Sequence, residues 1–86
     1  MEQQASVHTN TINIRLFGQF AEMAGSQSID VDWVADTDSL RRVLEARFPT
    51  LQQLPYLVAV DKDIATDNMI LHPHAVVALL PPYSGG

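Results

Sequence analysis

The chain has 86 residues, of which 47% are hydrophobic and 17% charged, so its composition is that of one globular domain with a single core. Ten acidic against five basic residues give a formal net charge of -5, which argues against a nucleic-acid or membrane partner. The chain has no cysteine, which excludes disulfides, Cys-type zinc sites and a cysteine nucleophile. We expect neither a secretory leader nor a membrane span, and therefore a cytoplasmic protein.

The N-terminal part of the chain predicts a tail followed by a strand. Residues 1–10 are polar and show no periodicity, which indicates a flexible tail. From residue 11 onward, every second side chain is apolar, which is typical of a half-buried strand. These apolar residues are Ile12, Ile14 and Leu16. Phe17 breaks the alternation and suits a core aromatic and an exposed anchor for a partner equally well.

A short helical turn and a second strand are expected next. The segment QFAEMAG contains good helix formers and reaches Gly25, where a left-handed cap is expected. The segment QSIDVDW then alternates with a period of two, which places Ile29, Val31 and Trp33 on one buried face.

The segment VADTDSLRRVLEARFP changes to a helical period. Its apolar residues recur at spacings of three and four, which predicts an amphipathic helix. They are Leu40, Val43, Leu44 and Phe48. We expect Thr37 or Asp38 to cap the start of this helix and Pro49 to end it.

Two further strands complete the predicted fold. The segment YLVAVDKDI predicts a third strand over residues 56–61, with a bend from Asp61 to Asp63, and AVVALLPP predicts a last strand apolar enough to lie between two neighbours. The order strand, strand, helix, strand, strand predicts an α+β fold of the β-grasp, or ubiquitin-like, type over residues 11–82. In this fold a mixed sheet carries one main helix on one face. The fold alone does not define a function.

The sequence ends in ALLPPYSGG, which predicts an extended tail over residues 83–86. Pro81 and Pro82 cannot donate hydrogen bonds to a strand ladder, so the sheet is expected to stop there. Gly85 and Gly86 carry no Cβ and can pass through a narrow channel. A carboxylate at Gly86 is ionised at neutral pH and can attack the α-phosphate of ATP to give an acyl-adenylate, from which a sulfur donor displaces AMP and leaves a thiocarboxylate.

The segments INIRLFGQFAEMAG, DTDSLRRVLEARFP, VAVDKDI and ALLPPYSGG together resemble the small, sulfur-carrier subunit of molybdopterin synthase. This resemblance to a ubiquitin-like sulfur-carrier family covers residues 12–86. It implies that a ubiquitin-activating-like adenylyltransferase adenylates Gly86 with ATP and that a sulfur donor converts it to a thiocarboxylate. The large subunit of molybdopterin synthase would then receive the tail, and the sulfur would pass to cyclic pyranopterin monophosphate in molybdenum cofactor biosynthesis.

The resemblance also implies roles for particular residues. Five tail residues would thread the partner's channel: Pro81, Pro82, Tyr83, Ser84 and Gly85. Phe17, Ile64 and Leu80 would contact the partners, although burial is slightly favoured for Ile64 and Leu80 on their own. The chain itself would be a non-catalytic, sulfur-donating subunit that binds no cofactor, in a heterotetramer of two small and two large subunits.

Three other functions remain open from the residues alone. The chain could carry sulfur for another pathway, such as thiamine synthesis or amino-acid thiolation, or act as a ubiquitin-like protein modifier, or be a binding module with an inert tail. Lys62 is the only lysine, so self-conjugation has one possible side-chain site.

No metal site is expected in the sequence. His72 and His74 flank Pro73, which predicts a surface turn. Asp61, Asp63 and Asp67 lack the glycine and the terminal glutamate of a calcium loop, which favours a solvated hairpin.

Overall fold

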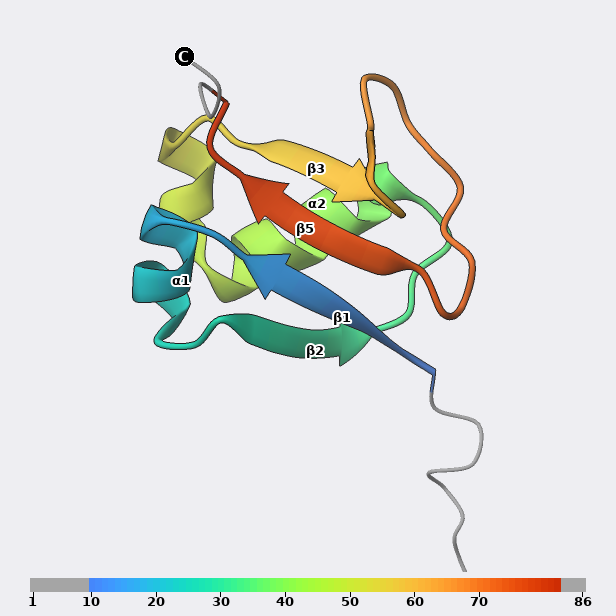
Figure 1. Ribbon diagram of the computed structural model, residues 1–86, viewed down its shortest axis with the longest axis horizontal. Helices are drawn as coiled ribbons and strands as arrows, with labels where there is room; N and C mark the ends of the chain where they lie inside the picture. Colours follow the sequence, from blue (N-terminus) through green and yellow to red (C-terminus); the bar gives the residue numbers. More distant parts are fainter. Residues whose placement is uncertain (1–9, 83–86) are drawn as a thin grey trace, which may run out of the picture.

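The protein is described by a computed structural model over residues 10–82, which contains a five-stranded mixed sheet with one long helix on one face (Figure 1). The strands are β1 (Thr11–Leu16), β2 (Ser28–Asp32), β3 (Leu57–Val60), β4 (Asp63–Ile64) and β5 (Val76–Leu80). The helices are α1 (Gln19–Ala24), α2 (Thr37–Arg47) and the 3-10 helix η2 (Pro49–Gln53). The predicted α+β fold of β-grasp type is confirmed. None of the helices in this part of the chain is long and apolar enough to cross a membrane.

The last strand of the chain occupies the middle of the sheet. The strand order is β2-β1-β5-β3-β4, and β5 runs parallel to β1 and antiparallel to β3. The predicted position of this strand between two neighbours is therefore confirmed. Because β1 and β5 are parallel, the start of β1 and the end of β5 lie at opposite ends of the sheet (Figure 1).

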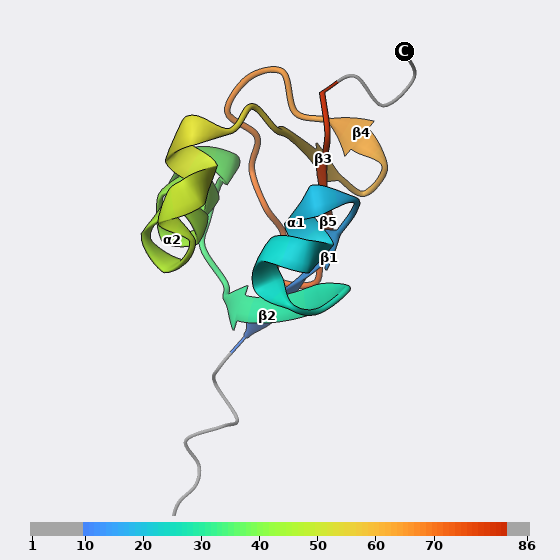
Figure 2. The same cartoon turned by 90° about the vertical axis from the view of Figure 1, so that its left-hand side faces the viewer.

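The core lies between the sheet and α2. Figure 2 shows α2 on one side of the sheet. The residues of β1, β3 and β5 that face the core are fully or almost fully buried, whereas Ile29 of β2 is half-buried. In register, Ile14 pairs with Val77, and Leu16 pairs with Leu79. The core cluster consists of Ile12, Ile14, Leu16, Phe20, Val31, Leu40, Leu44, Leu51, Val58, Val60, Leu71, Ala75, Val77 and Leu79. Burial of this contiguous apolar surface is the main stabilising contribution.

Trp33 does not lie where the alternation of QSIDVDW predicted it. Strand β2 ends at Asp32, and Trp33 is 37% exposed instead of continuing the buried face of Val31. Its backbone N–H donates to the Asn10 carbonyl, and its indole Nε1–H donates to the Leu71 carbonyl at 3.1 Å. This indole hydrogen bond joins the end of β2 to the loop between β4 and β5, residues 65–75, which we call the crossover loop.

The connections around α2 also differ from the prediction. Helix α2 ends at Arg47 with Phe48 as its C-cap, and Pro49 opens the 3-10 helix η2, which the sequence pattern missed. Strand β3 covers residues 57–60 and not 56–61, and the short strand β4 adds a fifth strand. Two predicted features of the turns are confirmed. The bend near Asp61 is present, because Asp61 and Lys62 both have positive φ angles, of 50° and 77°. The expected left-handed cap at Gly25 is present too, with a φ of 72°.

The start of α2 is capped by Asp36, and not by Thr37 or Asp38 as predicted. The Asp36 carboxylate accepts a hydrogen bond from the Ser39 backbone N–H at 3.0 Å. Asn68 of the crossover loop donates from its Nδ2 to the second Asp36 oxygen at 3.1 Å, and its Oδ1 accepts from the Asp38 backbone N–H at 2.8 Å. Thr37 is instead buried and accepts from the Met69 backbone N–H. These contacts fasten the loop before β5 to the start of α2.

This capping network predicts an acid-sensitive contribution to stability. The hydrogen bonds from Ser39 and Asn68 hold the pKa of Asp36 below its ordinary value of 3.8. Because the folded-state pKa is the lower one, the stabilisation is fully present above pH 4 to 5 and is lost as the pH falls through the folded-state pKa. We therefore expect Asp36→Ala to lower the urea midpoint at pH 7 and to lower it much less at pH 3.

A matched carboxylate provides the control for this prediction. Asp67 is exposed and makes no side-chain hydrogen bond within residues 10–82. Asp67→Ala removes the same charge, so its urea midpoint should match that of the unsubstituted protein at both pH values. An equal loss of stability in Asp36→Ala at pH 7 and pH 3 would contradict the assigned role of the carboxylate.

Candidate functional site: the outer sheet face and the end of strand β5

The face of the sheet that points away from α2 carries an apolar surface, which we call the outer face. Strand alternation places alternate residues of β1, β5 and β3 on it, because their neighbours fill the core. The apolar members are Phe17, Leu57, Ala59, Ile64, Val76, Ala78 and Leu80. Two cations, Arg15 and Lys62, stand among them.

A shallow groove of about 540 Å³ runs over β5 on this outer face. Ala59 of β3 and Ala78 of β5 are direct register partners, so two small side chains lie next to each other at its floor. Larger side chains surround them, including Phe17 and Val76, which are 46% and 50% exposed. An exposed apolar surface of this kind, with a polar rim, marks an interaction site on a protein of this size.

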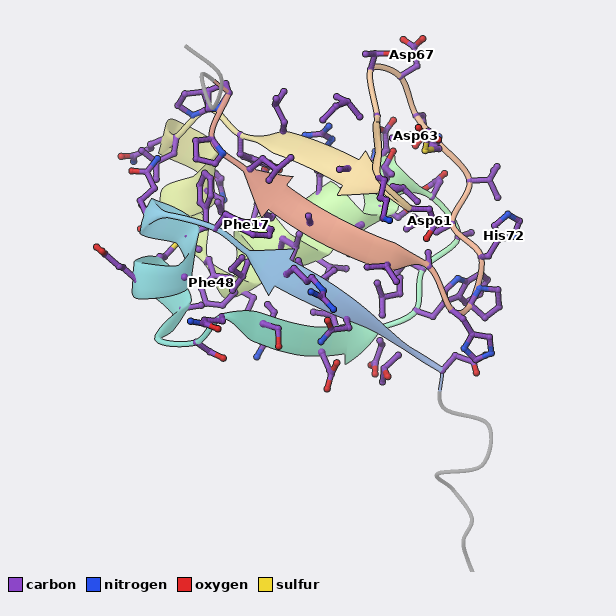
Figure 3. The ribbon with its side chains drawn as sticks, viewed as in Figure 1. Phe17, Phe48, Asp61, Asp63, Asp67 and His72 are labelled. Atoms are coloured by element: carbon purple, nitrogen blue, oxygen red, sulfur yellow. The ribbon has the colours of Figure 1, made fainter. Side chains whose placement is uncertain are left out.

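Phe17 is an exposed residue at the rim of the groove. It follows β1 directly and continues the outward side of the strand's alternation, so its ring lies over the sheet face that points away from α2 (Figure 3). The sequence was equally compatible with a core position and an exposed position for Phe17, and in the structure its side chain is exposed. An aromatic side chain in such a position is typical of an interface residue.

The other two predicted interface residues give a mixed result. Ile64 is 43% exposed on β4, so the expectation of burial drawn from its own sequence context is wrong. The reason is that β4 has only two residues and lies at the edge of the sheet. Leu80 is half-buried at the end of β5, beside its register partner Leu57.

The residue that follows β5 lies close to the turn after β1. Gly18 has a φ of 57° and a ψ of -130°, a combination that favours glycine. A Cβ at Gly18 would lie 3.6 Å from the Pro81 ring, so the two residues are in close approach. Pro81 is half-buried, whereas Pro82 is exposed. The chain beyond the sheet therefore starts next to Gly18.

The four last residues of the predicted site, Tyr83, Ser84, Gly85 and Gly86, lie outside the described residues. The sequence reasoning missed Gly18, Ala59 and Ala78. The alternation in AVVALLPP would have placed Ala78 on the outer face, whereas the pairing of Ala59 with Ala78 depends on the strand order. Within residues 10–82, no group of three His, Cys, Asp or Glu side chains is placed to hold a metal ion.

The acidic hairpin lies at the other end of the sheet from Phe17. Asp61 lies in the turn after β3, Asp63 in β4 and Asp67 in the loop after β4 (Figure 3). The Asp61 carboxylate accepts from the Val76 backbone N–H at 3.0 Å, which joins the turn to the start of β5. This carboxylate therefore has a structural partner.

A mixed sheet with one long helix on one face, whose last strand lies in the middle and is followed by two prolines, is a β-grasp, ubiquitin-like fold. The comparison with family profiles agrees, because the ThiS family matches residues 14–86. The chain belongs to this family of ubiquitin-like sulfur carriers. No curated protein sequence matches the chain.

Solved structures agree with this assignment at the level of the fold. SAMP1 from Haloferax volcanii is 27% identical, with a TM-score of 0.68 over 88% of this chain and 99% of that chain. The small archaeal modifier protein 1 (SAMP1) from Methanosarcina acetivorans is 16% identical, with a TM-score of 0.74 over 92% and 99% of the two chains. A protein from Pyrococcus furiosus assigned as molybdopterin converting factor, subunit 1, is 17% identical, with a TM-score of 0.76 over 84% and 97%.

We expect Phe17→Asp to weaken the binding of a partner at the outer face at least tenfold, because aromatic anchors contribute strongly to binding and a buried unpaired carboxylate is costly. The unfolding midpoint should change little, since Phe17 is 46% exposed. Calorimetric titration with the partner measures the first effect and urea unfolding the second. Unchanged binding would contradict the assignment of Phe17 to the interface.

Proposed function

We propose that this chain is the sulfur-carrier small subunit of a molybdopterin synthase. In this role the Gly86 carboxylate is adenylated by a ubiquitin-activating-like adenylyltransferase and converted to a thiocarboxylate. The sulfur then passes to cyclic pyranopterin monophosphate at the large subunit. The observation that carries the proposal is the match of the ThiS family through residue 86, combined with a central strand that ends at Pro81 and Pro82.

The proposed chemistry needs only a reachable carboxylate on this chain. A Gly86 oxygen attacks the α-phosphorus of ATP on the activating enzyme, pyrophosphate leaves, and an acyl-adenylate forms. A hydrosulfide-level nucleophile then attacks the acyl carbon, and AMP leaves. Four residues beyond Pro82 span at most about 13 Å when extended, which is enough to enter a partner's pocket while the sheet stays outside.

The outer face is the docking surface in this proposal. Both Phe17 and Pro81 lie next to Gly18, so the apolar surface and the start of the tail are adjacent. A partner that covers the groove is therefore placed to receive the tail in its own pocket. The catalytic groups of the synthase would belong to the large subunit.

The test is the intact mass of the protein before and after incubation with ATP, a sulfide source and the adenylyltransferase. We expect a mass gain of one sulfur-for-oxygen exchange, followed by its loss when the large subunit and cyclic pyranopterin monophosphate are added. A thiocarboxylate that forms but is not consumed by these two would exclude this acceptor and favour a carrier for another pathway, such as thiamine synthesis or amino-acid thiolation. No mass gain would contradict a carrier role.

A second candidate function is protein modification. It is favoured by the similarity to SAMP1 from Haloferax volcanii, which is 27% identical. In this role Gly86 would form an isopeptide bond with a target lysine, and slower-migrating conjugates would be seen on denaturing gels. Conjugates of this chain with itself through its only lysine would disappear in Lys62→Arg.

A further inference from the structure

The groove over β5 differs in charge from the chain as a whole. The whole chain has a formal net charge of -5, yet the groove over β5 is lined by two cations, Arg15 and Lys62, against one carboxylate, Asp61. That carboxylate already accepts the Val76 backbone N–H. In the lining of this groove, cations therefore outnumber carboxylates, although the chain as a whole is acidic.

The two cations stand on opposite sides of β5. Arg15 belongs to β1 and is the register partner of Ala78, whereas Lys62 lies in the turn after β3. Since neighbouring strands lie about 4.8 Å apart, β1 and β3 are separated by roughly 10 Å across the groove. The cations thus bracket the apolar floor formed by Ala59 and Ala78.

Neither cation serves an evident structural purpose within residues 10–82. Both residues are exposed, and in this part of the chain neither forms an ion pair or donates a side-chain hydrogen bond. Lys62 also occupies a turn position with a φ of 77°, where glycine or asparagine would be less strained. Three of the five basic residues, in contrast, lie on α2, on the other side of the sheet: Arg41, Arg42 and Arg47.

We infer that the partner at the outer face is a protein whose apolar contact surface is flanked by carboxylates, one facing Arg15 and one facing Lys62. This inference rests on the proposed function, in which a protein partner covers the groove. Opposite charges at the rim of an apolar contact speed association and fix its orientation more than they raise its affinity. The two cations would therefore fix the orientation of the bound partner over β5. This orientation would also decide where the partner's pocket lies relative to the C-terminal tail.

The experiment measures association of the full chain with the large subunit of molybdopterin synthase from the same organism, by stopped-flow at low and high salt. For Arg15→Glu combined with Lys62→Glu, we expect roughly a tenfold or greater fall in the association rate constant at low salt. The difference should shrink strongly near 1 M salt, where the Debye length is about 3 Å. Urea unfolding of the same variant checks that the fold is kept.

The matched control is Arg42→Glu combined with Arg47→Glu, which changes the net charge by the same amount on α2, away from the groove. Its association rate constant should fall less than that of the groove variant. If the two double variants lowered the association rate constant equally, the change in net charge alone would explain the result, and the inference would be overturned. So would a groove variant that binds like the unsubstituted protein while Phe17→Asp does not bind, although the proposed docking would then still stand. If the unsubstituted chain does not bind the large subunit, the proposed docking is wrong, and this inference with it.

Discussion

Removal of Gly86 is expected to lower thiocarboxylate formation by at least about a hundredfold and to leave the stability of the domain unchanged. The loss of one residue shortens an extended tail by about 3.3 Å, so the new terminal carboxylate stops short of the α-phosphorus. A misplacement of about 1 Å is already enough to reduce a positioned reaction by about two orders of magnitude. The measurement is the intact-mass assay with ATP, a sulfide source and the activating enzyme.

Two variants of unchanged length distinguish the effect of tail length from the effect of side-chain bulk. Ser84→Ala keeps the length and both glycines, so we expect near-normal thiocarboxylate formation. Gly86→Ala keeps the length but adds a Cβ to the residue that enters the partner's narrow channel. We therefore expect thiocarboxylate formation to fall strongly. If the chain without Gly86 were thiolated as fast as the full chain, the terminal residue would not be the carrier group.

Leu79→Ala is expected to destabilise the domain by about 2–5 kcal/mol, a large share of the stability of a small domain. Leu79 is fully buried at the centre of the sheet, between its register partners Leu16 and Val58. Truncation leaves a cavity that the two neighbouring strands cannot fill without shifting. Urea unfolding followed by the fluorescence of Trp33, the only tryptophan, measures the loss.

Val76→Ala is the matched control on the same strand. Val76 is 50% exposed on the outer face, so its truncation should cost less than about 1 kcal/mol. Similar losses for both variants would contradict the assignment of Leu79 to the core. At temperatures where Leu79→Ala is partly unfolded, thiocarboxylate formation should fall with the folded fraction, because the activating enzyme is expected to recognise the folded outer face.

The sequence predicted much of this fold because its strongest signals are local. The alternation around Ile14 and the helical period around Leu40 and Leu44 each report which side chains face a core, and these patterns decide the element types. The predictions that were wrong or incomplete depended on contacts between distant segments. Trp33 leaves the buried face because its indole bonds to the Leu71 carbonyl, and Asp36 caps α2 together with Asn68 of the crossover loop.

The candidate site was predictable in part for the same reason. The Pro81 and Pro82 boundary follows from backbone chemistry, and the exposure of Phe17 is consistent with the outward side of the β1 alternation. The groove was not predictable, because it requires Ala59 and Ala78 to become register partners. The gathering of Arg15 and Lys62 also required the strand order, since 46 residues of sequence separate them from each other.

The central position of β5 has a consequence for how the protein is made in the cell. During synthesis, β1 and β3 are both made before β5, the strand to which both are paired. Until β5 is made, the strand edges that it pairs with have no partner, and apolar residues of the incomplete sheet are exposed to solvent. We therefore expect a chain truncated before β5 to be degraded by proteases. A folded copy has therefore completed β5, the strand that directly precedes Pro81 and Pro82.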